Sequence, residues 1–334
     1  GLYSGVAQSL PALGVQRICA TGFELLRQAA EQLRDEVQLA LCVAAESMSR
    51  NPIAAYTHRG GFRLGGEVQF KDFLWEALYD PAPGLDMIAT ADNLARRYGL
   101  SRETVDRYAC DSHQRALQAQ REGAWVEEIV PVDNQVFELD GYQPRRLTLA
   151  HRAAAVTEDS HPRPTDLDAL ARLRAVHADG VQTAGNSCAV VDGAAAALVG
   201  RASGCTRPAL ARLVASAVVG VDPAFMGIGP APAIRLLLHR SGLRLDEIGR
   251  VEINEAQAAQ VLAVAQELEL DSARLNVQGG SLALGHPLAA SGLRLVMTLA
   301  RQLRRHNLRY GIAAACVGGG QGMALLIENP AWRA

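Results

Sequence analysis

Apolar and polar positions alternate in two different rhythms along the second half of the chain. Short apolar runs predict strands over residues 209–220, 250–254, 275–277, 311–316 and 323–328, and helical periodicity predicts helices over residues 231–240, 258–268 and 290–304. Runs that are apolar at nearly every position are typical of strands covered on both faces. Residues 206–334 are therefore expected to form an α/β core around a largely buried sheet.

Part of the same order of elements recurs near the N-terminus. Strands are predicted at residues 14–18, 37–44 and 194–199, and a helix runs from Cys19 to about residue 33. If the halves are repeats, the turn at Cys19 corresponds to the turn at His286, because both turns follow a strand and open a long helix. Residues 1–50 with about 181–205 then form a first core.

The segment between these two parts, residues 51–180, is polar and interrupted by Pro and Gly, with helical pieces at residues 89–98 and 102–122. We expect an inserted loop domain, since insertions at strand ends in α/β folds commonly form the walls of ligand sites.

The chain begins with Gly1, and two βα units that open the second half have no counterpart in the first half. Their absence predicts unpaired sheet edges and exposed apolar surface. We therefore expect reduced stability, or dependence on a partner or a longer chain.

Composition excludes several classes of partner. The formal net charge of −2 gives no global attraction to nucleic acid or an anionic membrane, and no apolar stretch is long enough to span a bilayer. The six cysteines have no paired CxxC spacing, and the N-terminus lacks a secretory signal, so reduced thiols and a cytoplasmic location are expected.

Both strand-to-helix turns carry reactive side chains. Cys19 opens a helix whose positive end favours a thiolate, although a buried structural cysteine is an equally ordinary reading. His286 lies between Gly285 and Pro287, where the glycine allows a ligand to approach closely. A lone histidine is usually structural, but this position favours a functional one.

Two further segments also follow strands. Cys316 precedes Gly318-Gly319-Gly320, a run that suggests backbone N–H groups facing an oxyanion, although a plain β-turn or bulge would explain it too. Asn254-Glu255 begins a helix, so Asn254 could cap that helix or orient a water molecule or substrate.

Taken together, these segments closely resemble the thiolase family over nearly the whole chain. Cys19 falls at the position of the family's acylated cysteine, and the other matches are Asn254-Glu255-Ala256 on its NEA motif, Gly285-His286-Pro287 on its GHP motif and Cys316 with Gly318-Gly319-Gly320 on its CxGGG motif. The resemblance implies a thiolase-like fold of two repeated βαβαβαββ halves in a five-layer α/β/α/β/α arrangement with an inserted loop domain. It also implies CoA thioesters as substrates, no metal or redox cofactor, and a homo-oligomer, either a dimer or a tetramer.

The resemblance also implies a role for each matched residue. His286 takes the proton of Cys19, whose thiolate attacks an acyl thioester to give an acyl-enzyme. Cys316 moves the second proton, either from the α-carbon of acetyl-CoA or to the departing carbanion. One oxyanion hole consists of His286 and a water held by Asn254, and the other of the backbone N–H groups of Cys19 and Gly318.

On the substrate side, the resemblance places Ser216 at the pantetheine arm of CoA and Met87 in the acyl channel, with Ala256 and Gln257 beside them. Gln257 replaces the aromatic residue of the family's NEAFA stretch, and Asp86 stands where some biosynthetic members have His. Both changes border the substrate site, so an unusual substrate preference is expected.

Two rival functions stay open. One is a non-catalytic thiolase-like protein that binds CoA or lipid. The other is a condensing enzyme of the ketoacyl-synthase type, which uses two histidines with its cysteine and is disfavoured by the pairing of His286 with Cys316.

Other clusters are interpreted as structural. The arginines near one C-terminal helix are expected to form a solvated face, and they are Arg294, Arg301, Arg304, Arg305 and Arg309. Cys110 and His113 lack a second ligand pair, and Cys205 needs no role.

Overall fold

The computed structural model describes residues 1–33, 37–56, 59–150, 153–204 and 207–333. Cys205 lies outside these residues. Within the described part of the chain, no helix is both long and apolar enough to cross a membrane.

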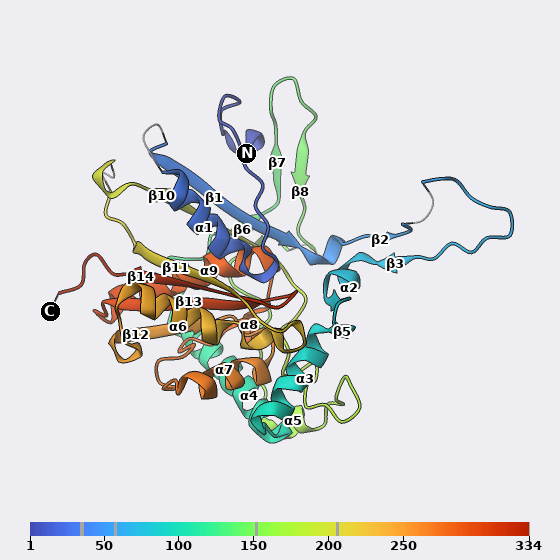
Figure 1. Cartoon of the computed structure of the whole chain (residues 1–334). Coiled ribbons are helices and arrows are strands. Elements are labelled where there is room, and N and C mark those ends of the chain that lie inside the picture. The colour runs from blue at the N-terminus through green and yellow to red at the C-terminus, as the bar shows by residue number, and fades with distance from the viewer. Residues whose placement is uncertain (34–36, 57–58, 151–152, 205–206, 334) are drawn as a thin grey trace.

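The C-terminal half is built on a four-stranded sheet in the order β11-β14-β13-β12 (Figure 1). The strands are β11 (Arg212–Gly220), β12 (Ile248–Ile253), β13 (Tyr310–Val317) and β14 (Gln321–Glu328). Only β12 and β13 are parallel to each other, and the other neighbours are antiparallel. The predicted strand at residues 275–277 is wrong, because Leu275 makes only an isolated bridge to Val251.

Both faces of this sheet are covered by helices. On one face, Ile312, Ala314 and Leu326 pack with α6 (Pro230–Ser241) and α7 (Ala258–Leu268). On the other, Ala313, Ala315 and Leu325 pack with α9 (Leu288–Arg305) and α1 (Thr21–Gln32). Alternate residues of one strand thus enter two separate cores, as expected for a strand that is apolar throughout.

The first core contains two antiparallel strands, β1 (Leu39–Ser47) and β10 (Asp192–Gly200). Cys42 and Ala44 of β1 face inward onto α1 and α9. The predicted strand at residues 14–18 is wrong: this segment pairs with no described strand and ends in a 3-10 helix, Ile18–Ala20. A strand needs a hydrogen-bonded neighbour, and β1 and β10 pair with each other.

The outer face of β1 and β10 is apolar and open to solvent. Leu41 and Leu198 lie opposite each other on this face, 55% and 66% exposed, and Val43 beside them is 55% exposed. Four of the five expected layers are therefore formed by described residues, and the outer helical layer over this sheet is not. The exposed apolar surface agrees with the expectation from the sequence, while the expected loss of stability stays a prediction.

The inserted segment contributes short elements. Its helices are α2 (Phe73–Ala77), α3 (Met87–Tyr98), α4 (Arg102–Arg121) and α5 (Leu167–Ala171). Its strand pairs are β2 (Ile53–Ala54) with β3 (Lys71–Asp72), β4 (Tyr79–Asp80) with β5 (Leu85–Asp86), β6 (Val132–Asp133) with β9 (Ala155–Val156), and β7 (Gln135–Phe137) with β8 (Arg145–Leu147). The β2–β3 and β7–β8 arms project from the body, while α3 and α4 lie against the C-terminal core (Figure 1).

The closest helix contact in the core joins α1 and α9. A Cβ atom on Gly22 would lie 2.3 Å from the backbone nitrogen of Leu293, and one on Gly292 would lie 2.6 Å from the backbone nitrogen of Phe23. The two helices thus touch backbone to backbone near their N-terminal ends. This contact brings the turns before the two helices, which carry Cys19 and His286, to one place.

The close contact between α1 and α9 predicts that adding one methyl group at Gly22 destabilises the fold. Gly22→Ala should destabilise the fold by about 3 kcal/mol, because backbone cannot yield as a flexible side chain would. Gly220→Ala is the matched control, since a Cβ there meets nothing within 4 Å. Thermal unfolding of both variants tests this, and equal melting temperatures would show that α1 and α9 can separate at little cost.

Candidate active site

Four of the residues singled out in the sequence converge at the carboxyl ends of β12 and β13. Asn254 directly follows β12, Cys316 lies near the end of β13, and Cys19 and His286 precede α1 and α9. Cys19 and His286 are 7% and 3% exposed, and Asn254 and Cys316 are fully buried. A site at strand ends, walled by an insertion, is the usual position in α/β folds.

Hydrogen bonds hold the imidazole of His286 on both sides. Its Nδ1 lies 2.6 Å from the hydroxyl of Ser291, and its Nε2 lies 3.3 Å from Nδ2 of Asn254. Burial, and then the charge of Arg294, lowers the pKa of His286 to about 3. The ring is therefore neutral at physiological pH and can serve as a base but not as a resident cation.

The thiol of Cys19 is protonated in the resting site. Burial raises the pKa of Cys19 to about 11, although the backbone N–H groups of Gly318 and of Cys19 itself act in the opposite direction. The expectation that the helix end would favour a thiolate is therefore wrong, because desolvation outweighs the helix end. Burial likewise raises the pKa of Cys316 well above its ordinary value.

The glycine run after Cys316 forms a turn, and it also places a backbone N–H group beside Cys19. Gly319 and Gly320 have φ angles of 83° and 78° and form the turn between β13 and β14. At the start of this turn, the N–H of Gly318 faces the sulfur of Cys19. The run is thus a β-turn, and it also directs a backbone donor toward the Cys19 sulfur, while its role at an oxyanion stays a prediction.

The two polar residues of the NEA motif, Asn254 and Glu255, make different contacts. Asn254 does not cap α7, which begins only at Ala258, so its amide is free to face His286. Glu255 accepts hydrogen bonds from Tyr108 and Ser112 of α4, from Asn276 and from the backbone N–H of Leu282. This carboxylate fastens the inserted segment to the C-terminal core.

A cavity of about 170 Å³ opens onto Cys19 and His286. Its walls are mostly apolar, and they include the predicted substrate-side residues Met87, Ala256 and Gln257. Asp86 also lines the cavity and forms an ion pair with His177 at 2.9 Å. Ser216 is not brought to the cavity. It pairs with Leu325 in mid-sheet, whereas the cavity lies at the strand ends.

Several neighbours of the site gave no signal in the sequence. Ser187, Cys188 and Ala189 line the cavity from the segment before β10, and burial raises the pKa of Cys188 to about 12. Ser281 and Ser291 contact Asn254 and His286 directly. Serines in an Ala- and Gly-rich turn resemble many others, so only the fold identifies them.

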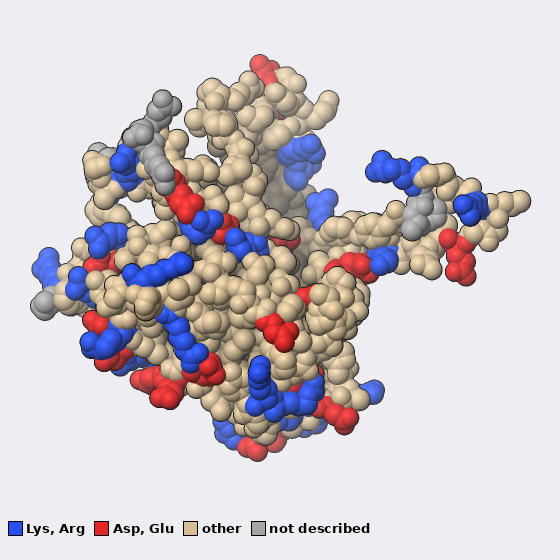
Figure 2. Space-filling view, in the orientation of Figure 1, with Lys and Arg blue, Asp and Glu red and all other residues tan. Residues whose placement is uncertain are grey.

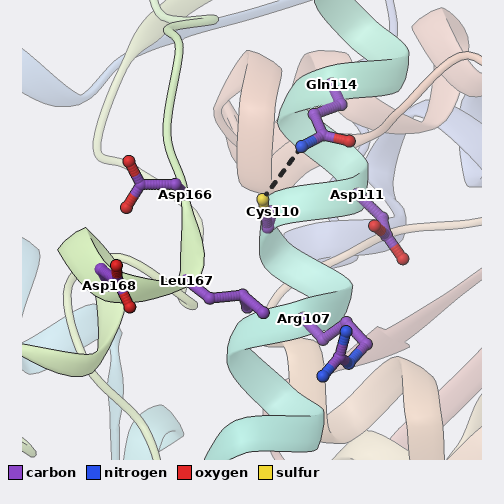
Figure 3. A pocket seen from close by; sticks show the side chains of 7 residues that line it. All are labelled: Arg107, Cys110, Asp111, Gln114, Asp166, Leu167 and Asp168. Atoms are coloured by element: carbon purple, nitrogen blue, oxygen red, sulfur yellow. Dashed lines mark hydrogen bonds between the residues drawn. The ribbon is translucent and has the colours of Figure 1, made fainter.

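A larger surface hollow of about 400 Å³ lies between α4 and α5, far from this chemistry (Figure 3). Three of its polar side chains are already engaged: Gln114 donates to the sulfur of Cys110, Asp166 caps α5, and Arg107 pairs with Glu103. The described residues also contain no cluster of three or more His, Cys, Asp or Glu side chains that could hold a metal ion. Cys110 and His113 remain structural in our interpretation.

Comparison with known proteins gives one family across the chain. Residues 1–203 match the family model "Thiolase, N-terminal domain", and residues 207–329 match "Thiolase, C-terminal domain". The mitochondrial 3-ketoacyl-CoA thiolase of Bos taurus is 40% identical over 99% of this chain and 82% of its own length. An acetyl-CoA acetyltransferase of Pseudomonas aeruginosa is 38% identical over 98% of this chain and 81% of its own length.

Solved structures agree with the sequence matches. The crystal structure of human mitochondrial 3-ketoacyl-CoA thiolase in complex with CoA superposes with a TM-score of 0.90 at 38% identity. The match covers 98% of this chain and 80% of that one. An acetyl-CoA acetyltransferase from Bacillus anthracis gives a TM-score of 0.87. With family models matched along both halves and relatives near 40% identity, the chain belongs to the thiolase family.

Proposed function

We propose that this protein is an acyl-CoA C-acyltransferase that cleaves 3-ketoacyl-CoA with CoA, or condenses two acyl-CoA molecules, through an acyl group on Cys19. The observation that carries the proposal is a cavity lined by Cys19 and the neutral imidazole of His286, with the thiol of Cys316 packed behind its wall residues Met226 and Ala256 and the backbone N–H groups of Cys19 and Gly318 beside the Cys19 sulfur. Each of these groups has a task in carbon–carbon bond chemistry at a thioester.

Acylation is the first step. His286 takes the proton from Cys19 as the sulfur attacks the thioester carbonyl, and the bond to the sulfur of the leaving CoA breaks. The N–H groups of Cys19 and Gly318 stabilise the oxyanion that forms on that carbonyl. Because the resting pair is uncharged, the proton moves during attack, when the developing oxyanion compensates for the new charge.

The second step uses Cys316. The Cys316 thiol gives its proton to the CoA thiolate that leaves in the first step. In condensation, the resulting Cys316 thiolate removes a proton from the α-carbon of acetyl-CoA, and the enolate carbon attacks the acyl carbonyl on Cys19. The new carbon–carbon bond forms while the bond from the Cys19 sulfur to the acyl carbon breaks, which releases 3-ketoacyl-CoA. His286 and a water held by Asn254 would stabilise the enolate oxygen. Cleavage is the reverse sequence.

CoA thioesters are the proposed substrates, with no metal or redox cofactor. The apolar walls of the cavity, including Met87 and Ala256, suit an acyl chain, while Gln257 and the Asp86–His177 pair supply its polar part. Asp86 and Gln257 are the positions where an altered substrate preference would arise. The cytoplasmic location stays a proposal, because the similar proteins include both mitochondrial and bacterial ones.

Two alternative functions would require different features of the site. A non-catalytic protein that binds CoA or lipid would need the cavity but not an acylated Cys19. A ketoacyl-synthase-type enzyme would pair its cysteine with two imidazoles, whereas here the second titratable partner of Cys19 is the thiol of Cys316.

Acylation can be tested directly. Incubation with acetyl-CoA should add one acetyl group to the protein, and intact-protein mass spectrometry with peptide mapping should place it on Cys19. Cys19→Ser should lose the adduct. Cys316→Ala should keep it but lose condensation, by on the order of 100-fold or more, because the proton at carbon has no other acceptor.

Cys42→Ala is the matched control for this experiment, because Cys42 is a buried cysteine that contacts Leu25 and lies outside the cavity. It should be acylated like the wild type. A folded wild-type protein that never gains the adduct would favour the non-catalytic binder.

The raised pKa of Cys19 predicts how the free enzyme reacts with iodoacetamide. Below a pKa of about 11, the thiolate fraction and hence the alkylation rate of Cys19 should rise about tenfold per pH unit. The rise should continue without a plateau from pH 7 to 9.5. A plateau below pH 8 would mean that Cys19 and His286 already form an ion pair before substrate is added.

We also propose a homo-oligomer, a dimer or a tetramer, and the exposed apolar face of β1 and β10 supports self-association. Leu41→Lys combined with Leu198→Glu should reduce the sedimentation coefficient without lowering the melting temperature. Gln8→Glu with Gln69→Lys adds the same charges at exposed polar positions and should change neither. Unchanged sedimentation of the first variant would exclude this face.

A further inference from the structure

A chain of five hydrogen bonds runs through the buried site from a cation to a backbone carbonyl. Arg294 Nη2 donates to Ser281 Oγ at 3.3 Å, and the Ser281 hydroxyl donates to Asn254 Oδ1 at 2.8 Å. Asn254 Nδ2 lies 3.3 Å from His286 Nε2, and His286 Nδ1 lies 2.6 Å from Ser291 Oγ. The Ser291 hydroxyl then donates to the carbonyl of Pro287 at 3.2 Å.

The Arg294 end of this chain determines its direction. A guanidinium can only donate, so Ser281 receives from Arg294 and has its own proton left for Asn254. With Oδ1 of Asn254 accepting from Ser281, Nδ2 faces Nε2 and donates to it, so the one proton of the neutral imidazole is on Nδ1 and is donated to Ser291. Every donor therefore points the same way. The imidazole carries its proton on Nδ1 and presents the Nε2 lone pair.

The central amide is the member that could otherwise reverse. The two orientations of an Asn side chain have nearly the same shape, so packing alone does not distinguish them. In the reversed orientation, Oδ1 of Asn254 would face the Nε2 lone pair, and the Ser281 proton would lose its acceptor in a fully buried position. An unpaired buried donor is costly, so Ser281 holds the amide in the donating orientation.

Arg294 anchors this arrangement from α9. The expectation that Arg294 lies on a solvated helix face is wrong, because its Nη1 is buried. The charge of Arg294 lowers the pKa values of four nearby groups, which are His286, Glu252, Glu128 and Asp159. The three carboxyl groups among them are close enough to the guanidinium for its charge to lower their pKa values against the effect of burial. Ser281 is thus the only link in this chain between Arg294 and the Asn254 amide.

We propose that Ser281 is a positioning residue that, held by Arg294, locks the Asn254 amide with its N–H toward His286 and so keeps His286 the neutral Nδ1–H tautomer that accepts the proton of Cys19. This inference rests on the proposed function. It adds a residue that touches neither the cavity nor the reacting atoms.

Ser281→Ala tests the proposal with two readouts that move in opposite directions. Without Ser281, the Asn254 amide is no longer held in one orientation, and its hydrogen bond to His286 is lost. Because this bond is made to a reacting group, kcat for acetoacetyl-CoA cleavage should fall about tenfold, with KM within about twofold. A donor to Nε2 favours the neutral imidazole, so its loss should let His286 take the proton of Cys19 more readily. Alkylation of Cys19 by iodoacetamide at pH 8 should therefore become about threefold faster.

Other titratable and charged groups near this pair are left unchanged in the variant, and they are Glu46, Cys188, Glu252, Glu255, Arg294 and Cys316. Ser281→Thr keeps the hydroxyl and should restore both wild-type values. Ser112→Ala is the matched control: it removes a buried serine hydroxyl that bonds Glu255 but neither Asn254 nor His286. It should leave the alkylation rate unchanged.

Slower turnover with faster alkylation in Ser281→Ala, restored by Ser281→Thr, supports the proposal. Unchanged rates in Ser281→Ala, or equal losses in the Ala and Thr variants that follow their melting temperatures, overturn it. The alkylation readout needs no substrate. A wild-type protein that is not acylated would therefore refute the proposed function while the alkylation rates still decide the role of Ser281.

Discussion

The backbone contact between α1 and α9 is the constraint on which the site depends. Gly22 and Gly292 leave no room for a side chain where the helices meet, so the helices approach as closely as their backbones allow. Each helix begins just after a reactive residue. Because the contact lies near the N-terminal ends of both helices, it fixes the separation of Cys19 and His286.

Burial then sets the chemistry of the pair. Cys19 and His286 are both almost inaccessible, and each is held in its uncharged form, with pKa values of about 11 and about 3. A pair that is neutral at rest is protected from oxidation and from unproductive alkylation, because the thiolate is the reactive species. In the proposed mechanism, charges are separated only in the step in which an oxyanion forms beside the N–H groups of Cys19 and Gly318.

Polar networks hold the rest of the molecule around that pair. Glu255 accepts hydrogen bonds from α4 and from the backbone of α8 (Ser281–Leu284), so the inserted segment is tied to the sheet within one residue of Asn254. Behind it, Arg294 and Ser281 fix the orientation of the Asn254 amide. The Glu255 carboxylate and the Arg294 guanidinium thus act indirectly. Their hydrogen bonds restrict the positions of the neighbouring side chains that form the site.

The sequence by itself determined the elements of the C-terminal core, the helix after Cys19 and the four segments that meet at the site, because apolar periodicity and strand-to-helix turns are local properties. Only the tertiary structure decided what depends on distant neighbours. Residues 14–18 and 275–277 have strand-like sequences but no full ladder partner, Ser216 lies in mid-sheet rather than at the cavity, and burial overrides the helix end at Cys19. Ser281 and Arg294 became visible for the same reason, since hydrogen-bond direction and desolvation are set by the atoms that surround a group and not by its place along the chain.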